Sequence, residues 1–269
     1  MTLSRERKEV NWNMAAITPH VRWGSRDVNL TWVPESTTEM VSVARRVFSE
    51  GLGVLTFTFL AGSAIVINDV TNGGLGLLGM AVTTGLAYSL VVFVLYPVSG
   101  GHINPAVTVG QVAARRIPPS IAVLYVGAQA AGAVVGALLL ELIFRGFTSD
   151  VARTASLSFD PRMQGLTGGF LEAILTFVLV TAYFRGVLDR RGNPALGAIA
   201  MGLVVMFSFL MAFPITGAAL NVARVFGTDV LARHWTDFWW YWLGLAGGAV
   251  AGLGYEFLFA SHEEEPATQ

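Results

Sequence analysis

The sequence of 269 residues contains no cysteine and few charged residues. Without cysteine the chain can form neither a disulfide framework nor a thiolate metal site. Charged residues make up only 13% of the chain and hydrophobic residues 54%, whereas soluble domains are about 25% charged. The net charge of −1 argues against nucleic acid as a partner. This composition indicates a membrane protein.

Motifs for catalysis are also missing. The sequence has no Gly-x-Ser-x-Gly elbow, no phosphate-binding loop and no histidine pair at metal-ligand spacing. We therefore expect a protein that is not an enzyme and that needs neither a cofactor nor a metal. The few acidic residues inside apolar runs are Glu50, Glu141 and Glu172, with Glu256 nearer an end. Such residues are costly in a membrane and are usually functional or paired.

Six apolar runs are each close to the ~20 residues that a membrane-spanning helix needs. They cover residues 47–69, 77–98, 120–144, 166–187, 195–213 and 237–259. An even number of spans places both termini on the same side of the membrane. The sequence therefore predicts a multi-pass membrane protein.

The arginines between the runs predict which side holds the termini. They precede the first run and follow the second and the fourth, at Arg45, Arg46, Arg115, Arg116, Arg185, Arg190 and Arg191. The third connection also carries arginine, but it is long and the bias is weaker there. We expect cytoplasmic termini, with residues 1–44 as an N-terminal tail, 45–261 as the membrane domain and 262–269 as a C-terminal tail.

The stretch from Ser99 to Thr108, Ser-Gly-Gly-His-Ile-Asn-Pro-Ala-Val-Thr, follows the second run directly. Its two glycines allow a bend, Asn104 is a good helix N-cap, and Pro105 suits the first helical position. The helix that follows has about nine residues and is ~14 Å long. This is half of the ~30 Å hydrocarbon core of a bilayer, so the sequence predicts a half-length helix.

A matching stretch lies 117 positions later, where Gly217 matches Gly100 and Asn221 matches Asn104. Two half-helices placed tip to tip would cross one membrane thickness. Each N-terminal tip carries about half a positive charge, and each asparagine amide can donate two hydrogen bonds. Together these groups would repel cations and interrupt a proton-conducting chain of water molecules.

Two glutamates mark the same repeat, because Glu50 lies near the start of the first span and Glu172 near the start of the fourth. Each half, residues 45–144 and 166–261, contains three spans, so the second half inserts upside down relative to the first. We expect the glutamates to brace irregular backbone rather than to relay protons. Small residues at four-residue spacing predict close helix packing at Gly132, Gly136, Gly244, Gly248 and Gly252.

These motifs together resemble the aquaporin, or major intrinsic protein, family over nearly all of residues 45–260. The first loop, with Asn104-Pro105-Ala106, is similar to the family's first pore motif, and Asn221-Val222-Ala223 followed by Arg224 to its second. Asp189-Arg190-Arg191 resembles its cytoplasmic loop. The resemblance implies an all-α membrane protein with six transmembrane helices and two re-entrant half-helices in an inverted repeat. It also implies a homotetramer with a separate pore in each subunit.

The resemblance also assigns pore residues by position. The narrow outer selectivity filter would consist of Thr84, Phe209, Ala218 and Arg224. Arg224 would donate hydrogen bonds to the permeant and repel cations. Further pore-lining positions, largely through backbone carbonyls, would be Gly100, Gly101, His102, Gly217 and Ala219.

Two departures from the family pattern stand out. Val222 replaces the expected proline, so the second half-helix loses the preset φ of its first position. Valine is apolar and similar in volume, and we expect the two half-helices still to meet. The pair Thr84 and Phe209 matches neither strict water pores nor glycerol facilitators.

The favoured function is a passive channel that conducts water and excludes protons and ions, in the plasma (cell inner) membrane. Small neutral solutes are further candidates for conduction. The alternative is a facilitator for glycerol, urea, ammonia or a similar neutral solute. A coupled secondary transporter is less favoured, because the sequence offers no convincing carboxylate near the middle of a span.

Overall fold

The computed structural model describes residues 20–23, 26–29, 36–189 and 192–259. Two short strands, β1 (His20–Trp23) and β2 (Arg26–Asn29), form an antiparallel hairpin with His20 opposite Asn29. The rest of the expected N-terminal tail before Ser36, the expected loop residues Arg190 and Arg191, and the expected C-terminal tail lie outside the described residues. The membrane domain itself is helical.

Six helices in the described part of the chain are long and apolar enough to cross a membrane. They are α1 (Thr37–Val70), α2 (Gly76–Ser99), α4 (Pro119–Phe144), α6 (Gly165–Tyr183) continued by the π-helical turn η2 (Phe184–Leu188), α7 (Pro194–Thr216), and the 3-10 turn η3 (Phe238–Trp242) continued by α9 (Leu243–Phe259). Each expected apolar run coincides with one of them to within a few residues, except at the start of α1. The prediction of six spans is confirmed.

Helix α1 begins ten residues before the expected start of the first span. Its N-cap is Ser36, whose side chain accepts a hydrogen bond from the Glu39 backbone N–H at 3.2 Å. The first turns carry polar and charged side chains, so hydropathy alone does not mark them. Local capping chemistry, rather than apolar character, sets this boundary.

Three shorter helices complete the membrane domain: α3 (Pro105–Ala113), α5 (Val151–Ala155) and α8 (Val222–Ala232). Helices α3 and α8 are the two predicted half-helices. Each follows a helix that a glycine ends in the left-handed conformation, Gly100 after α2 with φ of 92° and Gly217 after α7 with φ of 79°. Glycine adopts this conformation without the steric cost of a Cβ.

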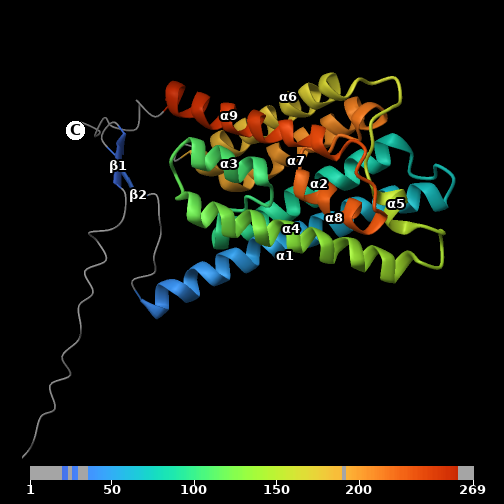
Figure 1. Ribbon diagram of the computed structural model, residues 1–269, viewed down its shortest axis with the longest axis horizontal. Coiled ribbons are helices and arrows are strands. Elements are labelled where there is room, and N and C mark those ends of the chain that lie inside the picture. The colour runs from blue at the N-terminus through green and yellow to red at the C-terminus, as the bar shows by residue number, and fades with distance from the viewer. Residues whose placement is uncertain (1–19, 24–25, 30–35, 190–191, 260–269) are drawn as a thin grey trace, which may run out of the picture.

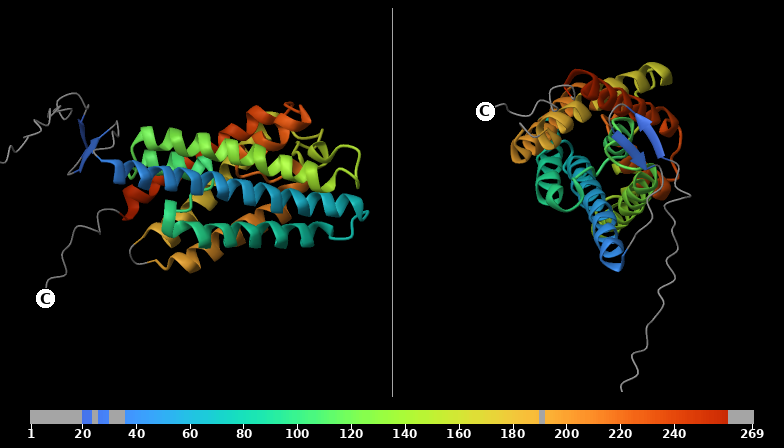
Figure 2. Two further views of the ribbon diagram at one scale, coloured as in Figure 1. Left: turned by 90° about the horizontal axis from the view of Figure 1, so that it is seen from below. Right: turned by 90° about the vertical axis from the view of Figure 1, so that its left-hand side faces the viewer.

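The helices pack as two related halves (Figures 1 and 2). Helix α1 packs on α4 and α6 on α9 within the halves, whereas α2 and α7 pack on each other between them. Each half-helix packs on the last span of the opposite half, α3 on α9 and α8 on α4. This crossed packing is the arrangement that the inverted repeat predicts, and it brings the tips of α3 and α8 into contact.

Small residues allow the close approach. A Cβ at Gly132 on α4 would lie 2.0 Å from the Gly51 carbonyl oxygen of α1, and one at Gly248 on α9 would lie 2.3 Å from the Ala106 carbonyl oxygen of α3. Neither distance is sterically possible, so the glycines are required for these helices to touch. The packing role predicted for the glycine spacing is confirmed at both positions.

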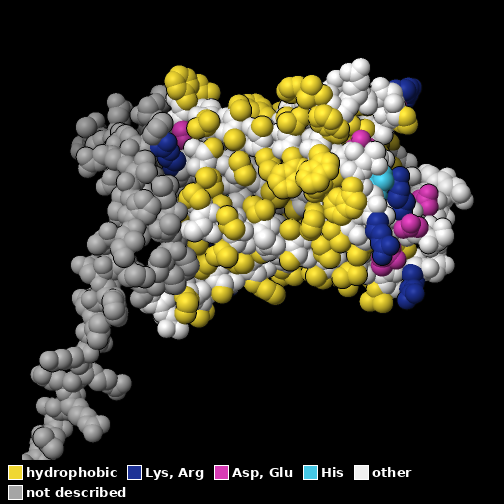
Figure 3. Space-filling model, in the orientation of Figure 1, with side chains coloured by type: hydrophobic (Ala, Val, Ile, Leu, Met, Phe, Trp, Pro, Cys, Tyr) yellow, Lys and Arg dark blue, Asp and Glu magenta, His cyan; other side chains and the backbone are white. Residues whose placement is uncertain are grey.

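The exterior fits a membrane environment. Apolar side chains cover the middle of the visible face, and charged side chains gather toward the two ends of the long axis (Figure 3). Many large apolar residues on the outer faces of the spans are exposed, for example Phe48, Leu86, Leu142 and Phe257. Such a broad apolar band is compatible with lipid contact along the bundle.

Candidate functional site

Two loops of matching backbone conformation form the centre of the molecule. Gly100 and Gly101 of the first loop have positive φ, as do Gly217 and Ala218 at the equivalent positions of the second loop. The repeat extends to Ile103 and Leu220, with φ of 40° and 52°. A left-handed conformation at a non-glycine residue costs roughly 1–3 kcal/mol and persists only where the surroundings enforce it.

Glu50 enforces the conformation of the first loop. Its Oε1 accepts hydrogen bonds from Ser99 Oγ at 2.6 Å and the His102 backbone N–H at 3.0 Å. Its Oε2 accepts from the Ile103 N–H at 2.6 Å and Gln129 Nε2 at 2.8 Å. The carboxylate of this fully buried residue thus meets four donors, and two of them are amides of the strained loop.

Glu172 does the same for the second loop. Its Oε1 accepts from Thr216 Oγ1 at 2.6 Å and the Ala219 N–H at 3.1 Å, and its Oε2 accepts from the Leu220 N–H at 2.9 Å. These contacts support the bracing interpretation of both glutamates, because each carboxylate is occupied by loop donors. The difference is Gln129, which adds a fourth donor only to Glu50.

The two asparagines are bonded crosswise. Asn104 Nδ2 donates to the Leu220 carbonyl oxygen at 2.8 Å, and Asn221 Nδ2 donates to the Ile103 carbonyl oxygen at 2.8 Å. Each side-chain oxygen caps its own half-helix: Asn104 Oδ1 accepts from the Ala106 N–H and Asn221 Oδ1 from the Ala223 N–H. Each asparagine therefore caps one half-helix and ties its loop to the opposite loop.

Each cross-loop bond uses one of the two amide hydrogens of its asparagine. An amide NH₂ group has two donors, so each asparagine keeps one donor for another acceptor. The sequence suggested two available donors at each position; the structure leaves one, because the opposite carbonyl takes the other. The N-terminal ends of α3 and α8 meet beside the two asparagines, and the helix dipoles add a positive potential there.

A histidine, a threonine and two tyrosines gather around the first loop. His102 Nδ1 lies 3.1 Å from Thr108 Oγ1, and the His102 ring contacts Tyr125 and Tyr183 edge-on at centroid distances of 5.1 and 5.7 Å. The hydroxyl of Tyr183 donates to the Gly100 carbonyl oxygen at 3.0 Å. One of the carbonyls predicted to line the pore is thus also held by a side chain.

Tyrosines from the last span of each half hold equivalent carbonyls. Tyr125 of α4 donates to the Ser99 carbonyl oxygen at 3.0 Å, and Tyr241 of η3 donates to the Thr216 carbonyl oxygen at 2.5 Å. His102 and Thr108 have no such counterparts, because Ala219 and Val225 occupy the equivalent places. The first-loop side of the site is therefore more polar than a symmetric repeat would make it.

The four predicted filter residues come from separate elements: Thr84 from α2, Phe209 from α7, Ala218 from the second loop and Arg224 from α8. All four are buried. The guanidinium carbon of Arg224 lies 5.8 Å from the ring centroid of Phe57 on α1. Arg224 Nη1 and Nη2 and Thr84 Oγ1 find no hydrogen-bond partner among the described residues.

These unpartnered donors are chemically informative. A buried guanidinium nitrogen without an acceptor is costly, and water or another polar permeant can supply that acceptor. Thr84 on α2 and Arg224 on α8 therefore keep hydrogen-bonding groups available in the buried interior. Phe57 and Phe209 supply apolar surface in the same buried core.

Val222 occupies the first position of α8, as its proline counterpart Pro105 does in α3. The cross-loop hydrogen bonds and the contact between α3 and α8 both persist. The expectation that the half-helices still meet is confirmed.

Several contacting residues were not identified from the sequence: Phe57, Tyr88, Ile103, Tyr125, Gln129 and Leu220. Gln129 had a usable signal, because a glutamine inside an apolar span is expensive unless it is bonded. The carbonyls of Ile103 and Leu220 had no sequence signal, because every residue has a backbone carbonyl.

Comparison with known proteins agrees with this architecture. Residues 37–255 match the model of the family described as major intrinsic protein. The chain is 37% identical over 230 residues to a probable aquaporin TIP3-2 of Oryza sativa subsp. japonica, covering 83% of this chain and 84% of the relative. It is 39% identical over 225 residues to aquaporin TIP4-4 of Zea mays, covering 79% and 88%.

A solved structure gives the same fold. The X-ray structure of the aquaglyceroporin from Plasmodium falciparum superposes with a TM-score of 0.70 at 24% identity, covering 82% of this chain and 98% of that one. At this identity the likeness carries the fold alone. With the family match over most of the chain and six spanning helices, this chain is a multi-pass membrane protein of the major intrinsic protein family.

Proposed function

We propose that this protein is a passive channel that conducts water through the bundle and excludes protons and ions. The observation that carries the proposal is the crossed asparagine pair, in which Asn104 and Asn221 each bond to the opposite loop. This arrangement fixes two amide donors at the abutting N-terminal ends of two half-helices.

The remaining amide donor of each asparagine would bind the oxygen of a passing water molecule. A water molecule whose oxygen accepts from both amides has its hydrogens directed away along the pore, so it cannot relay a proton through that point. The positive ends of α3 and α8 add a barrier to cations. Neither effect hinders a neutral water molecule.

Arg224 is proposed to complete the outer filter with Thr84, Phe209 and Ala218. Its two buried nitrogens, which lack acceptors in the described chain, would bind the permeant, and its charge would repel cations. The carbonyls of the two loops and His102 would line the inner part. Relatives whose names contain the word aquaporin support water as the main permeant.

A facilitator for glycerol, urea, ammonia or a similar neutral solute is the alternative within the same fold. The small side chains of Thr84 and Ala218, which leave room in the proposed filter, favour it. A coupled transporter is disfavoured, because Glu50 and Glu172 are fully engaged with loop donors.

The proposal includes a homotetramer with one pore per subunit, in the plasma membrane, with both termini cytoplasmic. The arginine pairs at the ends of the spans support this orientation. Ser36→Cys gives the otherwise cysteine-free chain one thiol, and a membrane-impermeant thiol reagent added to intact cells and to inverted vesicles tests the orientation. Reaction in inverted vesicles alone is expected, and reaction in intact cells would show that the termini lie outside.

Purified protein in proteoliposomes tests the function. Under an impermeant osmolyte, vesicle shrinkage should be faster than in empty liposomes, linear in the gradient and independent of any ion gradient. Repeating the measurement with glycerol and with urea as the osmolyte distinguishes a water channel from a solute facilitator. Re-swelling faster than in empty liposomes identifies a solute facilitator, and its absence identifies a water channel.

A further inference from the structure

A tyrosine lies in the bundle interior between the filter and the asparagine pair. Tyr88 follows Thr84 by four residues on α2, which places it on the same helix face ~6 Å nearer the end of the helix that leads into the Asn104 loop. Only 1% of its surface is exposed. Tyr88 is therefore a buried side chain one turn beyond Thr84, on the side of the filter that leads to the asparagine pair.

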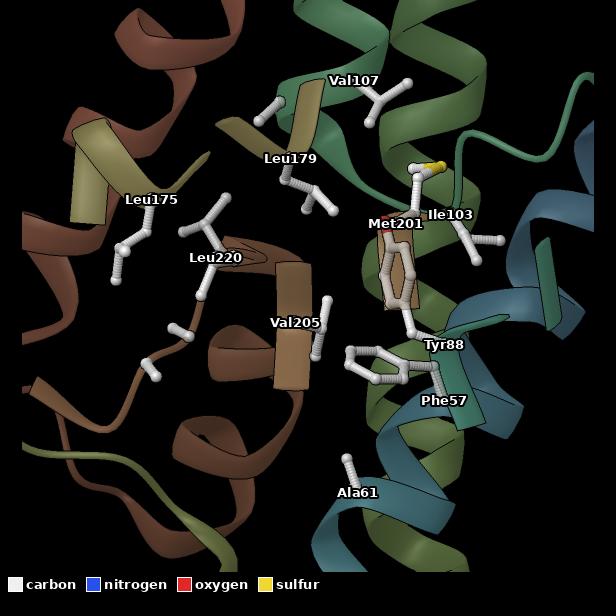
Figure 4. Close-up of a cluster of buried hydrophobic side chains, with 14 of the residues drawn as sticks. Phe57, Ala61, Tyr88, Ile103, Val107, Leu175, Leu179, Met201, Val205 and Leu220 are labelled. Atoms are coloured by element: carbon white, nitrogen blue, oxygen red, sulfur yellow. The ribbon is translucent and has the colours of Figure 1, made fainter. Parts of the chain in front are cut away.

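The surroundings of Tyr88 connect it to the proposed filter and to the asparagine pair. Its ring meets the Phe57 ring edge-on at a centroid distance of 4.9 Å, and the Phe57 ring in turn lies beside the guanidinium of Arg224. The Tyr88 hydroxyl lies close to the Asn104 side chain. In Figure 4 the ring of Tyr88 extends toward Met201, while that of Phe57 points toward Val205.

The Tyr88 hydroxyl faces the Asn104 side chain but makes no hydrogen bond within normal distance and angle limits in the described part of the chain. A buried hydroxyl normally finds a partner, and an orphan one in a native core calls for an acceptor or donor that comes from outside the protein. The same holds for Thr84 Oγ1, one turn away on α2. Two orphan hydroxyls on one helix face form a line from the filter toward Asn104.

The opposite surroundings are apolar. Phe57, Val205 and Phe209 belong to the same buried cluster as Tyr88, so the hydroxyls of Thr84 and Tyr88 are the hydrogen-bonding groups that α2 would offer a permeant here. The filter itself contains two small side chains, Thr84 and Ala218, and is a weak barrier to size. A bulky ring one turn deeper supplies the size restriction that the filter lacks.

We propose that Tyr88 forms a second selectivity point, which hydrogen-bonds permeating water through its hydroxyl and excludes polyols such as glycerol through its ring. This inference rests on the proposed channel function and specifies its substrate class: water is conducted and glycerol is not. The ring acts on size, and the hydroxyl replaces a hydrogen bond that water loses on entering the apolar stretch.

Two variants at this position separate the ring from the hydroxyl. Tyr88→Val removes both and should raise the ratio of glycerol to water permeability by about tenfold or more, as expected when a pocket loses its size restriction. Tyr88→Phe keeps the ring and should still exclude glycerol, but should lower water permeability by about twofold to fivefold through loss of one hydrogen bond. Tyr96→Val, the same replacement two turns later on α2, is the matched control and should resemble wild type.

All four proteins are compared in proteoliposomes by light scattering, with glycerol and an impermeant osmolyte, after their helical content is matched by circular dichroism. If wild type conducts water and Tyr88→Val excludes glycerol as well as wild type does, the inference is overturned and the channel function stands. Wild type that conducts glycerol, or Tyr96→Val that gains glycerol permeability as Tyr88→Val does, also overturns it. Wild type without water conduction contradicts the proposed function itself. Because Tyr88→Phe is nearly isosteric, its unchanged water permeability would refute the role of the hydroxyl even if Tyr88→Val did not fold.

Discussion

The side-chain nitrogen of Asn104 lies 2.8 Å from the carbonyl oxygen of Leu220, 116 residues away in the sequence. Asn221 makes the reciprocal bond to Ile103. The asparagines that cap the half-helices therefore also join the two halves of the repeat. One amide hydrogen of each is committed to this contact, and in the proposed channel the other would bind the permeant.

Removing Asn104 should cost more than removing an ordinary helix cap. Asn104→Ala loses the cap of α3 and the bond to Leu220, together about 2 kcal/mol of stability from typical values of about 1 kcal/mol for each. Asn193→Ala, which loses only the local cap of α7, is the control and should cost about 1 kcal/mol. Thermal unfolding in detergent measures both, and equal shifts would show that the cross-loop bond adds no stability.

The two bracing glutamates should differ in sensitivity to amide replacement. Each carboxylate oxygen of Glu50 accepts from two donors, so in Glu50→Gln the new NH₂ group faces two donors in either orientation of the amide. One oxygen of Glu172 accepts from the Leu220 N–H alone, so in Glu172→Gln the NH₂ group can turn to face that single donor. With about 1–3 kcal/mol for each donor left unsatisfied, the first variant should lose about twice the stability of the second.

Melting temperatures and the yield of folded protein measure this difference. Asp69→Asn, which also replaces a carboxylate by an amide but at an exposed position near the end of α1, provides the control and should melt like wild type. A Glu172 variant that is less stable than the Glu50 variant would contradict the donor count.

Restoring proline at position 222 should stabilise the protein slightly. Val222 is the first residue of α8, and Asn221 before it has φ of −140° and ψ of 97°, an extended conformation that a following proline accepts. Val222→Pro should add about 0.4–1 kcal/mol by restricting the unfolded chain, without loss of water permeability. The reciprocal change Pro105→Val should remove a similar amount, and a destabilised Val222→Pro would imply that the valine N–H is needed.

Mercury offers a test of the position of Ala218. The chain has no cysteine, so its water permeability should be unaffected by mercuric ions, which bind soft thiolates. Ala218→Cys should make the flux mercury-sensitive and recoverable with excess thiol. An insensitive but folded Ala218→Cys protein would remove Ala218 from the pore wall, and mercury inhibition of wild type would reveal a different site of action.

Much of the architecture follows from local sequence features. Apolar runs locate the six spans, glycines end α2 and α7, and the spacing of Glu50, Glu172 and the two asparagines predicts the repeat. These features work because capping, turn formation and apolar length are properties of short segments. The matching contacts of the two glutamates then follow from the symmetry of the halves.

The contacts that cross the bundle could not be predicted in the same way. Tyr88, Phe57 and Arg224 come from three different helices, and their alignment depends on how those helices rotate and pack. Within an apolar span a buried tyrosine is indistinguishable by pattern from one that faces lipid. The backbone carbonyls that bind Asn104 and Asn221 are present in every residue, so only the fold selects Leu220 and Ile103.

Water and proton permeability measured on the same wild-type proteoliposomes tests the crossed asparagine pair as a selective pore centre. Osmotic shrinkage followed by light scattering reports water, and an enclosed pH-sensitive dye reports protons under an imposed pH gradient. Water permeability should rise several-fold over empty liposomes while proton permeability stays at the level of the lipid. Shrinkage no faster than in empty liposomes, or a proton leak that rises together with the water flux, would contradict the proposed function.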